Sequence, residues 1–268
     1  MIDRGKHNIL GVRVDAVDYA AAVDRIAEAA VNRRPLAVSA LAVHGIMTGV
    51  LDPVHRIRLN NFDLVVPDGQ PVRWALNLLH GTRLSERVYG PTLMLEMCEW
   101  AAANKAPIFL FGGTAAQLTA LGKRLQLRFP GLWIVGTRPS AFRRLTAAER
   151  DQLVAEIRAS GAALTFVGLG CPRQEVWAYE NREALSMPLL AVGAAFAFHA
   201  GQLSQAPRFM QDRGLEWFYR MVREPRRLWK RYALLNPLYL ALLFAQWTGL
   251  RRFALDDAPL PTDLMFYG

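Results

Sequence analysis

An aspartate that directly follows an apolar strand is the strongest candidate for a catalytic group in this sequence. Residues 62–67 are mostly apolar and of strand length, Asp68-Gly69 follows them, and Pro71 then opens a predicted helix. A carboxylate on the rigid end of a strand can face the crevice where parallel sheets bind ligands, and can act there as a general base. Asp-Gly is also a common turn pair, and Asp is a common helix N-cap, so a purely structural role stays open.

Two glycine pairs at other strand ends are candidates for binding a phosphate. Gly112 and Gly113 follow one apolar run, and Gly168 and Gly170 follow another. Glycine allows backbone N–H groups to approach an anion closely, and the N-terminus of the next helix attracts negative charge. Neither segment matches the P-loop or the G-x-G-x-x-G fingerprint. We therefore expect a phosphate-bearing ligand, without a more specific identity.

Polar side chains at two further positions could contact a sugar or a nucleotide. Ser39 lies in the apolar run 36–43 with His44 directly after it, and Gln174 and Glu175 lie in the first turn of a predicted helix. A neutral amide beside a diphosphate or a ribose can donate a hydrogen bond without adding like charge. A strand followed by a helix cap explains Ser39 and His44 equally well, and a first-turn Glu can simply complement the helix dipole.

Several common catalytic patterns are missing from the sequence. No two aspartates stand two positions apart, the five histidines form no His-Glu-x-x-His pattern, and no Gly-x-Ser-x-Gly elbow occurs. We therefore expect no metal and no cofactor. If a diphosphate leaves during the reaction, arginines and backbone N–H groups must neutralise its charge.

The segments that must position these residues alternate between helices and strands. Predicted helices cover residues 19–30, 53–61, 71–79, 92–104, 115–129, 146–160 and 173–183, and predicted strands cover residues 36–43, 62–67, 107–111, 132–136, 163–168 and 189–192. Short strands that alternate with helices of this length favour parallel pairing. The sequence therefore predicts an α/β fold, a three-layer Rossmann-like sandwich around a parallel sheet.

Composition limits the class of protein further. The 268 residues are 52% apolar and 21% charged, which excludes global disorder. The two cysteines lie far apart, so a disulfide framework is not expected. The first thirty residues contain no signal-peptide core, and we expect a cytoplasmic location.

Most of the positive charge lies near the C-terminus. The net charge is +9, and residues 208–252 contribute +7 of it, with ten Lys and Arg against three Asp and Glu. The run 232–250 is apolar and aromatic, interrupted by Asn236, Pro237 and Gln246, and has bases on both sides. This pattern favours a segment that lies on an anionic membrane surface. A helix pair covered by a partner subunit, hence a homo-oligomer, stays open, and nucleic-acid binding is disfavoured.

These observations predict two regions. Residues 1–207 would form the α/β core, and residues 208–268 would form a basic, helical, membrane-associating appendage.

Seven motifs in sequence order resemble the WecG/TagA/CpsF family of bacterial glycosyltransferases. The motifs are Pro67–Gly69, Arg87–Gly90, Phe109–Gly113, Gly168–Glu175, Val192–Phe196, Ala206-Pro207, and Leu215–Arg220 with Glu224–Arg227. The resemblance implies an inverting, metal-independent transferase. Such an enzyme moves a sugar from a UDP-sugar to a polyprenyl-diphosphate-linked acceptor at the cytoplasmic face of the membrane, and so builds cell-surface polysaccharide or exopolysaccharide.

The resemblance also implies roles for individual residues. Asp68 matches the proposed catalytic base, and Ser39 matches a position usually held by Thr. Arg87 and Gln174 match residues that line the active-site pocket. The appendage of the family supplies arginines that close over the diphosphate, and Arg220 and Arg227 are the nearest matches. Arg223 and Arg231 are alternative alignments for these positions.

The sequence departs from the family pattern at two positions. Leu41 stands where Asn is frequent, and Ala197 stands where Asp is frequent. Both positions bear on the identity of the donor sugar. A second class of function also stays open: the same layout would serve a non-catalytic nucleotide-binding module that regulates a membrane-bound assembly, with Asp68 as a helix cap.

Overall fold

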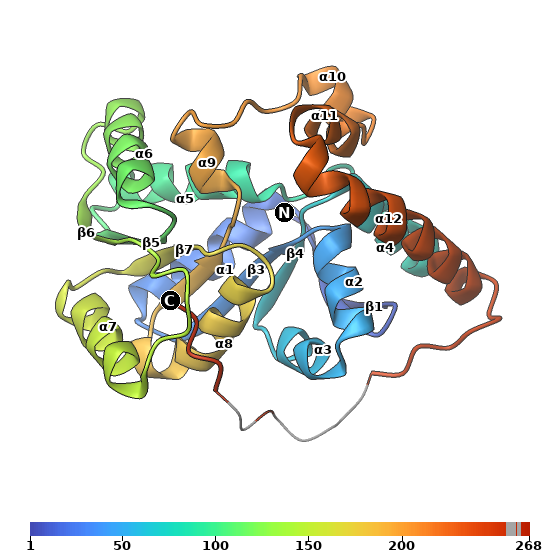
Figure 1. The fold of residues 1–268 in the computed structure, drawn as a ribbon, viewed down its shortest axis with the longest axis horizontal. Coiled ribbons are helices and arrows are strands. Elements are labelled where there is room, and N and C mark those ends of the chain that lie inside the picture. The colour runs from blue at the N-terminus through green and yellow to red at the C-terminus, as the bar shows by residue number, and fades with distance from the viewer. Residues whose placement is uncertain (256–260, 262–263) are drawn as a thin grey trace.

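The computed structural model describes residues 1–255, 261 and 264–268, without the side chains of Arg208, Arg227, Lys230 and Arg231. A six-stranded parallel sheet forms its centre (Figure 1). Its spatial order is β4-β3-β8-β7-β5-β6. The strands are β3 (Leu36–Leu41), β4 (Leu64–Pro67), β5 (Ile108–Gly112), β6 (Ile134–Arg138), β7 (Leu164–Gly168) and β8 (Pro188–Ala191). Every neighbouring pair in this order is parallel.

Helices cover both faces of the sheet. One core cluster includes side chains from α2 (Val43–Leu51), α3 (Pro53–Asn60), α4 (Gln70–His80), α7 (Ala147–Ala159) and α8 (Arg173–Leu185). A second cluster includes side chains from α1 (Tyr19–Val31), α5 (Gly90–Ala103), α6 (Ala115–Arg128) and α9 (Ala195–His199). Phe109 and Phe111 belong to the first cluster, whereas Ile108 and Leu110 belong to the second. This alternation along β5 confirms the predicted three-layer Rossmann-like α/β fold.

An antiparallel hairpin at the N-terminus was not predicted. Its strands are β1 (Asp3–Ile9) and β2 (Val12–Val17), and its turn residues Leu10 and Gly11 have φ values of 54° and 86°. Positive φ at both turn positions matches the twist of a tight hairpin. The polar residues of β1 hide the apolar pattern by which a strand is usually found.

The predicted strands differ from the structure by one or two positions at their ends, and the strand predicted over residues 62–67 begins at Leu64. The strand predicted over residues 36–43 ends at Leu41, because α2 begins at Val43, and the strand predicted over residues 132–136 lies two positions later as β6.

The C-terminal region is helical, as predicted, and its longest helix packs on the core. The helices are α10 (Arg208–Asp212), α11 (Glu216–Arg223) and α12 (Pro225–Trp247). Tyr239 of α12 is buried and donates a hydrogen bond to the carbonyl of Pro71 at 3.1 Å, and Leu243 lies in the same core cluster. Within the described residues, no helix combines the length and the apolar character needed to span a bilayer. The boundary between residues 207 and 208 stays a prediction.

Truncation of Tyr239 should reveal how firmly α12 belongs to the core. Tyr239 is 1% exposed, so Tyr239→Ala should lower the free energy of unfolding by about 3–5 kcal/mol, the range for large aromatic truncations. Its neighbour Leu240 is 61% exposed, and Leu240→Ala should change stability by less than about 0.5 kcal/mol. Denaturant titration measures both. Equal stability of the two variants would mean that α12 is energetically independent of the core.

Candidate active site

The predicted site residues gather at one edge of the sheet, where the strands end. β3 leads into α2 on one face, whereas its neighbour β8 leads into α9 on the other face. Connections that diverge in this way leave a crevice outside the carboxyl ends of the strands, which is where open α/β sheets bind ligands. Asp68 follows β4 at this edge, and Glu216 and Arg220 of the appendage helix α11 lie close enough to act on its charge.

Asp68 is a half-buried carboxylate fixed by a backbone donor. Its Oδ1 accepts a hydrogen bond of 2.6 Å from the N–H of Gly90, the first residue of α5. Its own N–H donates to the carbonyl of Leu41 at 3.2 Å. The N-cap of α4 is Gly69, so Asp68 does not cap the helix that follows it in the sequence. The carboxylate is therefore positioned by contacts between β4, β3 and α5.

The surroundings of Asp68 raise its pKa to about 6. Burial is the main cause, and the carboxylate of Glu216 adds to it, whereas the guanidinium groups of Arg87 and Arg220 and the N–H of Gly90 act in the opposite direction. A carboxylate that ionises just below neutral pH is able to take up a proton from a substrate and release it again. The electrostatics of Asp68 thus fit a general base.

Arg87 is held by the appendage rather than left open to the crevice. Its Nη2 donates to Glu216 Oε2 at 2.7 Å and to Gln211 Oε1 at 3.3 Å, and its Cζ lies 4.2 Å from the centre of the Tyr89 ring. The Tyr89 hydroxyl donates to the other oxygen of Glu216 at 2.8 Å. Sequence reasoning missed the roles of Tyr89, Gln211 and Glu216, although Glu216 stands out as one of three acids in a strongly basic segment.

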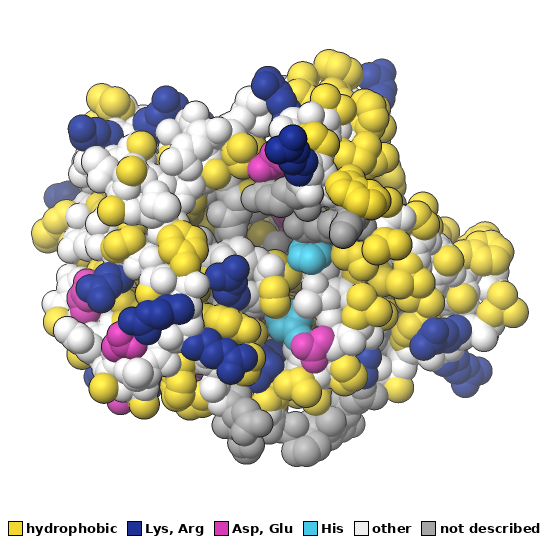
Figure 2. Space-filling view, in the orientation of Figure 1, with side chains coloured by type: hydrophobic (Ala, Val, Ile, Leu, Met, Phe, Trp, Pro, Cys, Tyr) yellow, Lys and Arg dark blue, Asp and Glu magenta, His cyan; other side chains and the backbone are white. Residues whose placement is uncertain are grey.

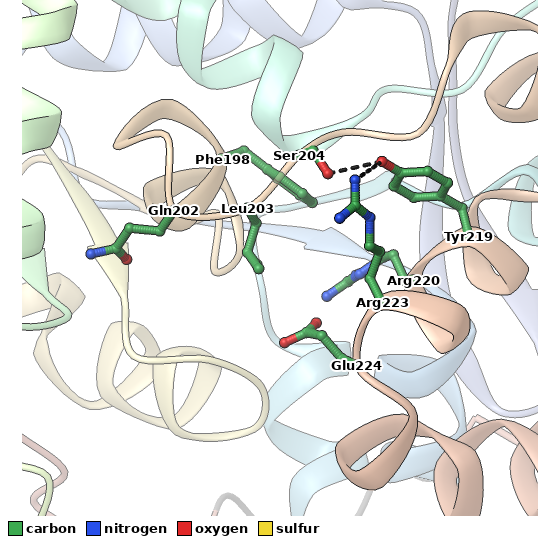
Figure 3. A pocket seen from close by; sticks show the side chains of 8 residues that line it. All are labelled: Phe198, Gln202, Leu203, Ser204, Tyr219, Arg220, Arg223 and Glu224. Carbon is green, nitrogen blue, oxygen red and sulfur yellow. Dashed lines mark hydrogen bonds between the residues drawn. The ribbon is translucent and has the colours of Figure 1, made fainter.

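A pocket between α9 and α11 contains the predicted arginine Arg220 (Figure 3). It encloses about 500 Å³ of space, part of it open to solvent, and its lining residues are Phe198, Gln202, Leu203, Ser204, Tyr219, Arg220, Arg223 and Glu224.

The polar groups of this pocket suit an anion. The buried Nε of Arg220 has no hydrogen-bond partner among the described residues, and its Cζ lies 5.8 Å from the centre of the Phe198 ring. Arg223 donates to the hydroxyl of Tyr219 at 3.3 Å, and that hydroxyl also hydrogen-bonds Ser204 at 2.8 Å. Arg227 lies in α12, but its side chain is outside the described part of the chain.

Ser39 and Gln174 meet in a buried polar cluster around Glu175. All three side chains are nearly inaccessible to solvent. Glu175 Oε1 accepts hydrogen bonds from Ser39 Oγ at 3.2 Å and from Gln174 Nε2 at 2.9 Å, and burial raises the pKa of Glu175. Gln174 Oε1 accepts from the N–H of Gly170 at 3.1 Å. These bonds place the cluster beneath the β7–α8 loop, and direct contact of Ser39 or Gln174 with a substrate stays a prediction.

The four predicted phosphate-binding glycines differ in their surroundings. A Cβ on Gly112 would lie 2.6 Å from the backbone of Gly168 on the next strand, and a Cβ on Gly168 would lie 2.5 Å from the ring of Phe196. Close packing alone therefore requires glycine at both positions. Gly113 and Gly170 have φ values of 63° and 78°, and a Cβ on Gly170 would face open space. Binding of a phosphate by these glycines stays a prediction, and the N–H of Gly170 donates to Gln174 in this structure.

Across the described residues, no group of three or more His, Cys, Asp or Glu side chains could hold a metal ion. A family model described as "Glycosyl transferase WecG/TagA/CpsF family" matches residues 7–253. The match includes the sheet, Asp68, and the helices α10 to α12.

Proposed function

Because the chain belongs to the WecG/TagA/CpsF family of glycosyl transferases, we propose that it moves a sugar from a UDP-sugar to a polyprenyl-diphosphate-linked acceptor with inversion of configuration. The observation that carries this proposal is the position of Asp68. Its carboxylate lies at the end of β4, is fixed by the N–H of Gly90, and has a pKa of about 6. The product would be a lipid-linked glycan for cell-surface polysaccharide or exopolysaccharide.

In the proposed reaction, Asp68 acts as the general base. The acceptor hydroxyl oxygen attacks the anomeric carbon from the face opposite UDP, and its proton passes to the Asp68 carboxylate. The bond between the anomeric carbon and the β-phosphate oxygen breaks, and its electron pair leaves with UDP. One displacement inverts the configuration at the anomeric carbon.

Arginines are the groups proposed to neutralise diphosphate charge. Arg220 supports this because its Nε is buried without a hydrogen-bond partner among the described residues, in a pocket that Ser204 and Tyr219 also line. A planar guanidinium donates in a fork that matches phosphate oxygens. Transfer without a metal ion or a cofactor remains part of the proposal, and Arg227 is proposed to join Arg220.

We propose that the appendage seats the enzyme on the cytoplasmic face of the membrane, where a lipid-linked acceptor lies. Large apolar side chains remain exposed along α11 and α12 and form much of the yellow surface over these helices in Figure 2. They are Trp217, Phe218, Val222, Trp229, Leu234, Leu238, Leu240, Phe244 and Trp247. A helix with exposed apolar and aromatic side chains next to bases is typical of a segment that lies in the lipid interface.

A donor screen tests the transferase activity. UDP-glucose, UDP-glucuronic acid and UDP-N-acetylmannosamine are each mixed with lipid-linked monosaccharide acceptors, and UDP release is measured. We expect release that depends on both the donor and the acceptor. Nucleotide binding without turnover for any pair would instead favour the regulatory module.

The membrane proposal predicts the behaviour of surface variants. Replacing Leu240 and Phe244 together with Glu should reduce the fraction of protein that floats with anionic vesicles at least tenfold, because burial of each side chain is worth about 1.5–3 kcal/mol. Leu127→Glu is the matched control, since Leu127 is equally apolar and highly exposed but lies on α6 of the core. Equal flotation of the two variants would argue against contact of α12 with lipid.

A further inference from the structure

A buried ion pair connects the appendage to the segment beside the general base. The side chains of Arg87 and Glu216 are 10% and 12% exposed, and their atoms Nη2 and Oε2 lie 2.7 Å apart. The second oxygen of Glu216 accepts from the Tyr89 hydroxyl at 2.8 Å. One carboxylate of α11 therefore binds two side chains of the core segment 87–90, from which it is separated by more than 120 residues in sequence.

The same core segment is attached through its backbone to β4 and to Asp68. The N–H of Val88 donates to the carbonyl of Pro67 at 3.0 Å, and the N–H of Tyr89 donates to the Tyr19 hydroxyl at 2.9 Å. The next N–H, that of Gly90, donates to Asp68 Oδ1 at 2.6 Å. A displacement of Arg87 or Tyr89 would thus move the donor that fixes the Asp68 carboxylate.

We propose that Glu216 is a positioning residue for the reaction: by holding Arg87 and Tyr89 it fixes the segment 87–90, and so makes the geometry of Asp68 depend on the docking of α11. This inference rests on the proposed role of Asp68 as general base. The inference gives Glu216, an acid in the basic appendage, a function that is separate from the binding of anionic lipid or diphosphate.

Loss of Glu216 would affect Asp68 in two ways. It would leave Arg87 buried without its carboxylate partner, and the guanidinium would then be available to pair with Asp68, which would make Asp68 a weaker base. It would also loosen the segment that carries the Gly90 N–H. Small errors in the position of a catalytic group can reduce turnover about a hundredfold.

Three variants separate geometry from charge. Glu216→Ala removes both acceptors, Glu216→Gln keeps one oxygen for a hydrogen bond, and Asp212→Asn removes a charge from an exposed position of the same appendage. In the full-length protein we expect Glu216→Ala to lower kcat by tenfold to a hundredfold with a smaller change in KM. Glu216→Gln should restore part of this loss, and Asp212→Asn should match wild type.

The pH dependence of kcat/KM is a further test, because a purely structural role of Glu216 would leave it unchanged. Among the described side chains, the charged or titratable groups coupled to Asp68 are Arg87, Glu216, Arg220, Tyr19 and Tyr89. Glu216 raises the pKa of Asp68. Glu216→Gln should therefore shift the acidic limb of kcat/KM to lower pH, whereas Asp212→Asn should leave it unchanged.

Hydrogen exchange measures the proposed coupling without relying on activity. The amides of residues 88–90 should exchange at least tenfold faster in Glu216→Ala than in Asp212→Asn. Equal exchange in these two variants would overturn the inference, as would faster exchange with unchanged kcat and an unchanged acidic limb. If Asp68→Asn retained full turnover, the proposed base would fail instead, and the exchange result would stand by itself.

Discussion

Asp68→Asn should reduce turnover by about a hundredfold to ten-thousandfold, the usual contribution of a general base. Asparagine has nearly the same shape and can still accept the hydrogen bond from the Gly90 N–H, so UDP binding should stay close to wild type. The loss therefore reports the missing proton acceptor rather than a collapsed site. Turnover is measured by UDP release at saturating donor and acceptor.

The pH dependence of the wild-type enzyme adds a second test of the same group. Asp68 must be ionised to accept a proton, so kcat/KM should fall as the pH drops through about 6. This limb should be absent from the residual activity of Asp68→Asn. Asp151→Asn, which alters an exposed carboxylate on α7, is the control and should retain both the rate and the limb. Wild-type turnover in Asp68→Asn would exclude Asp68 as the base.

The substitution Asp68→Asn should lower turnover without lowering the stability of the folded protein near neutral pH. The pKa of Asp68 in the folded protein is about 6, above its ordinary value of 3.8, so the folded state keeps a proton that the unfolded chain has already released between these values. Folding stability due to this group therefore falls as the pH rises from about 4 to about 6. At pH 7.5, Asp68→Asn should melt at a temperature equal to or above that of wild type, and any gain should vanish below pH 4.

Arg220→Ala should reduce turnover by about a hundredfold to a thousandfold, the effect of removing one strong donor to a developing negative charge. Arg220 projects into the pocket beside Phe198, and its Nε lacks a hydrogen-bond partner within the described chain. Arg220→Lys should recover only part of the rate, because an ammonium group lacks the planar fork of donors.

A matched arginine tests whether position or total charge matters. Arg251 is exposed, stacks on Phe253 with a Cζ-to-ring distance of 4.9 Å, and lies outside the pocket. Arg251→Ala removes the same charge from the same region and should keep turnover within about threefold. A comparable loss in both variants would mean that net charge, rather than the position of Arg220, supports the reaction.

The layers of the fold were predictable because burial leaves a periodic pattern in the sequence. The run 107–111 is continuously apolar, as a strand buried on both faces must be, and the structure has β5 at Ile108–Gly112. The hairpin escaped prediction because β1 contains Asp3, Arg4, Lys6 and His7, which mask its pairing with β2. Pairing of such a strand depends on its partner, which local composition does not reveal.

The candidate site was predictable only in part, for a related reason. The place of Asp68 at a strand end follows from local pattern, and the structure has it there. The pairing of Arg87 with Glu216 joins residues that no sequence periodicity relates, and tertiary packing alone brings them together. Local pattern likewise does not reveal that the Ser39 hydroxyl donates to the buried Glu175, which lies 136 residues later, and contact of Ser39 with a substrate stays a prediction.

The contact between the first turn of the chain and the last turn of α12 has a consequence for biosynthesis. Gln246 Oε1 accepts from the N–H of Leu10 at 2.9 Å, and Gln246 Nε2 donates to the carbonyl of Asn8 at 3.1 Å, across sequence separations of 236 and 238 residues. At the usual rate of translation, roughly 10–50 s pass between synthesis of the hairpin and synthesis of its partner. The hydrogen bonds between the hairpin and Gln246 can form only after α12, with its exposed apolar surface, has left the ribosome. The hairpin therefore gains these contacts at the same stage of synthesis at which the apolar surface of α12 becomes exposed.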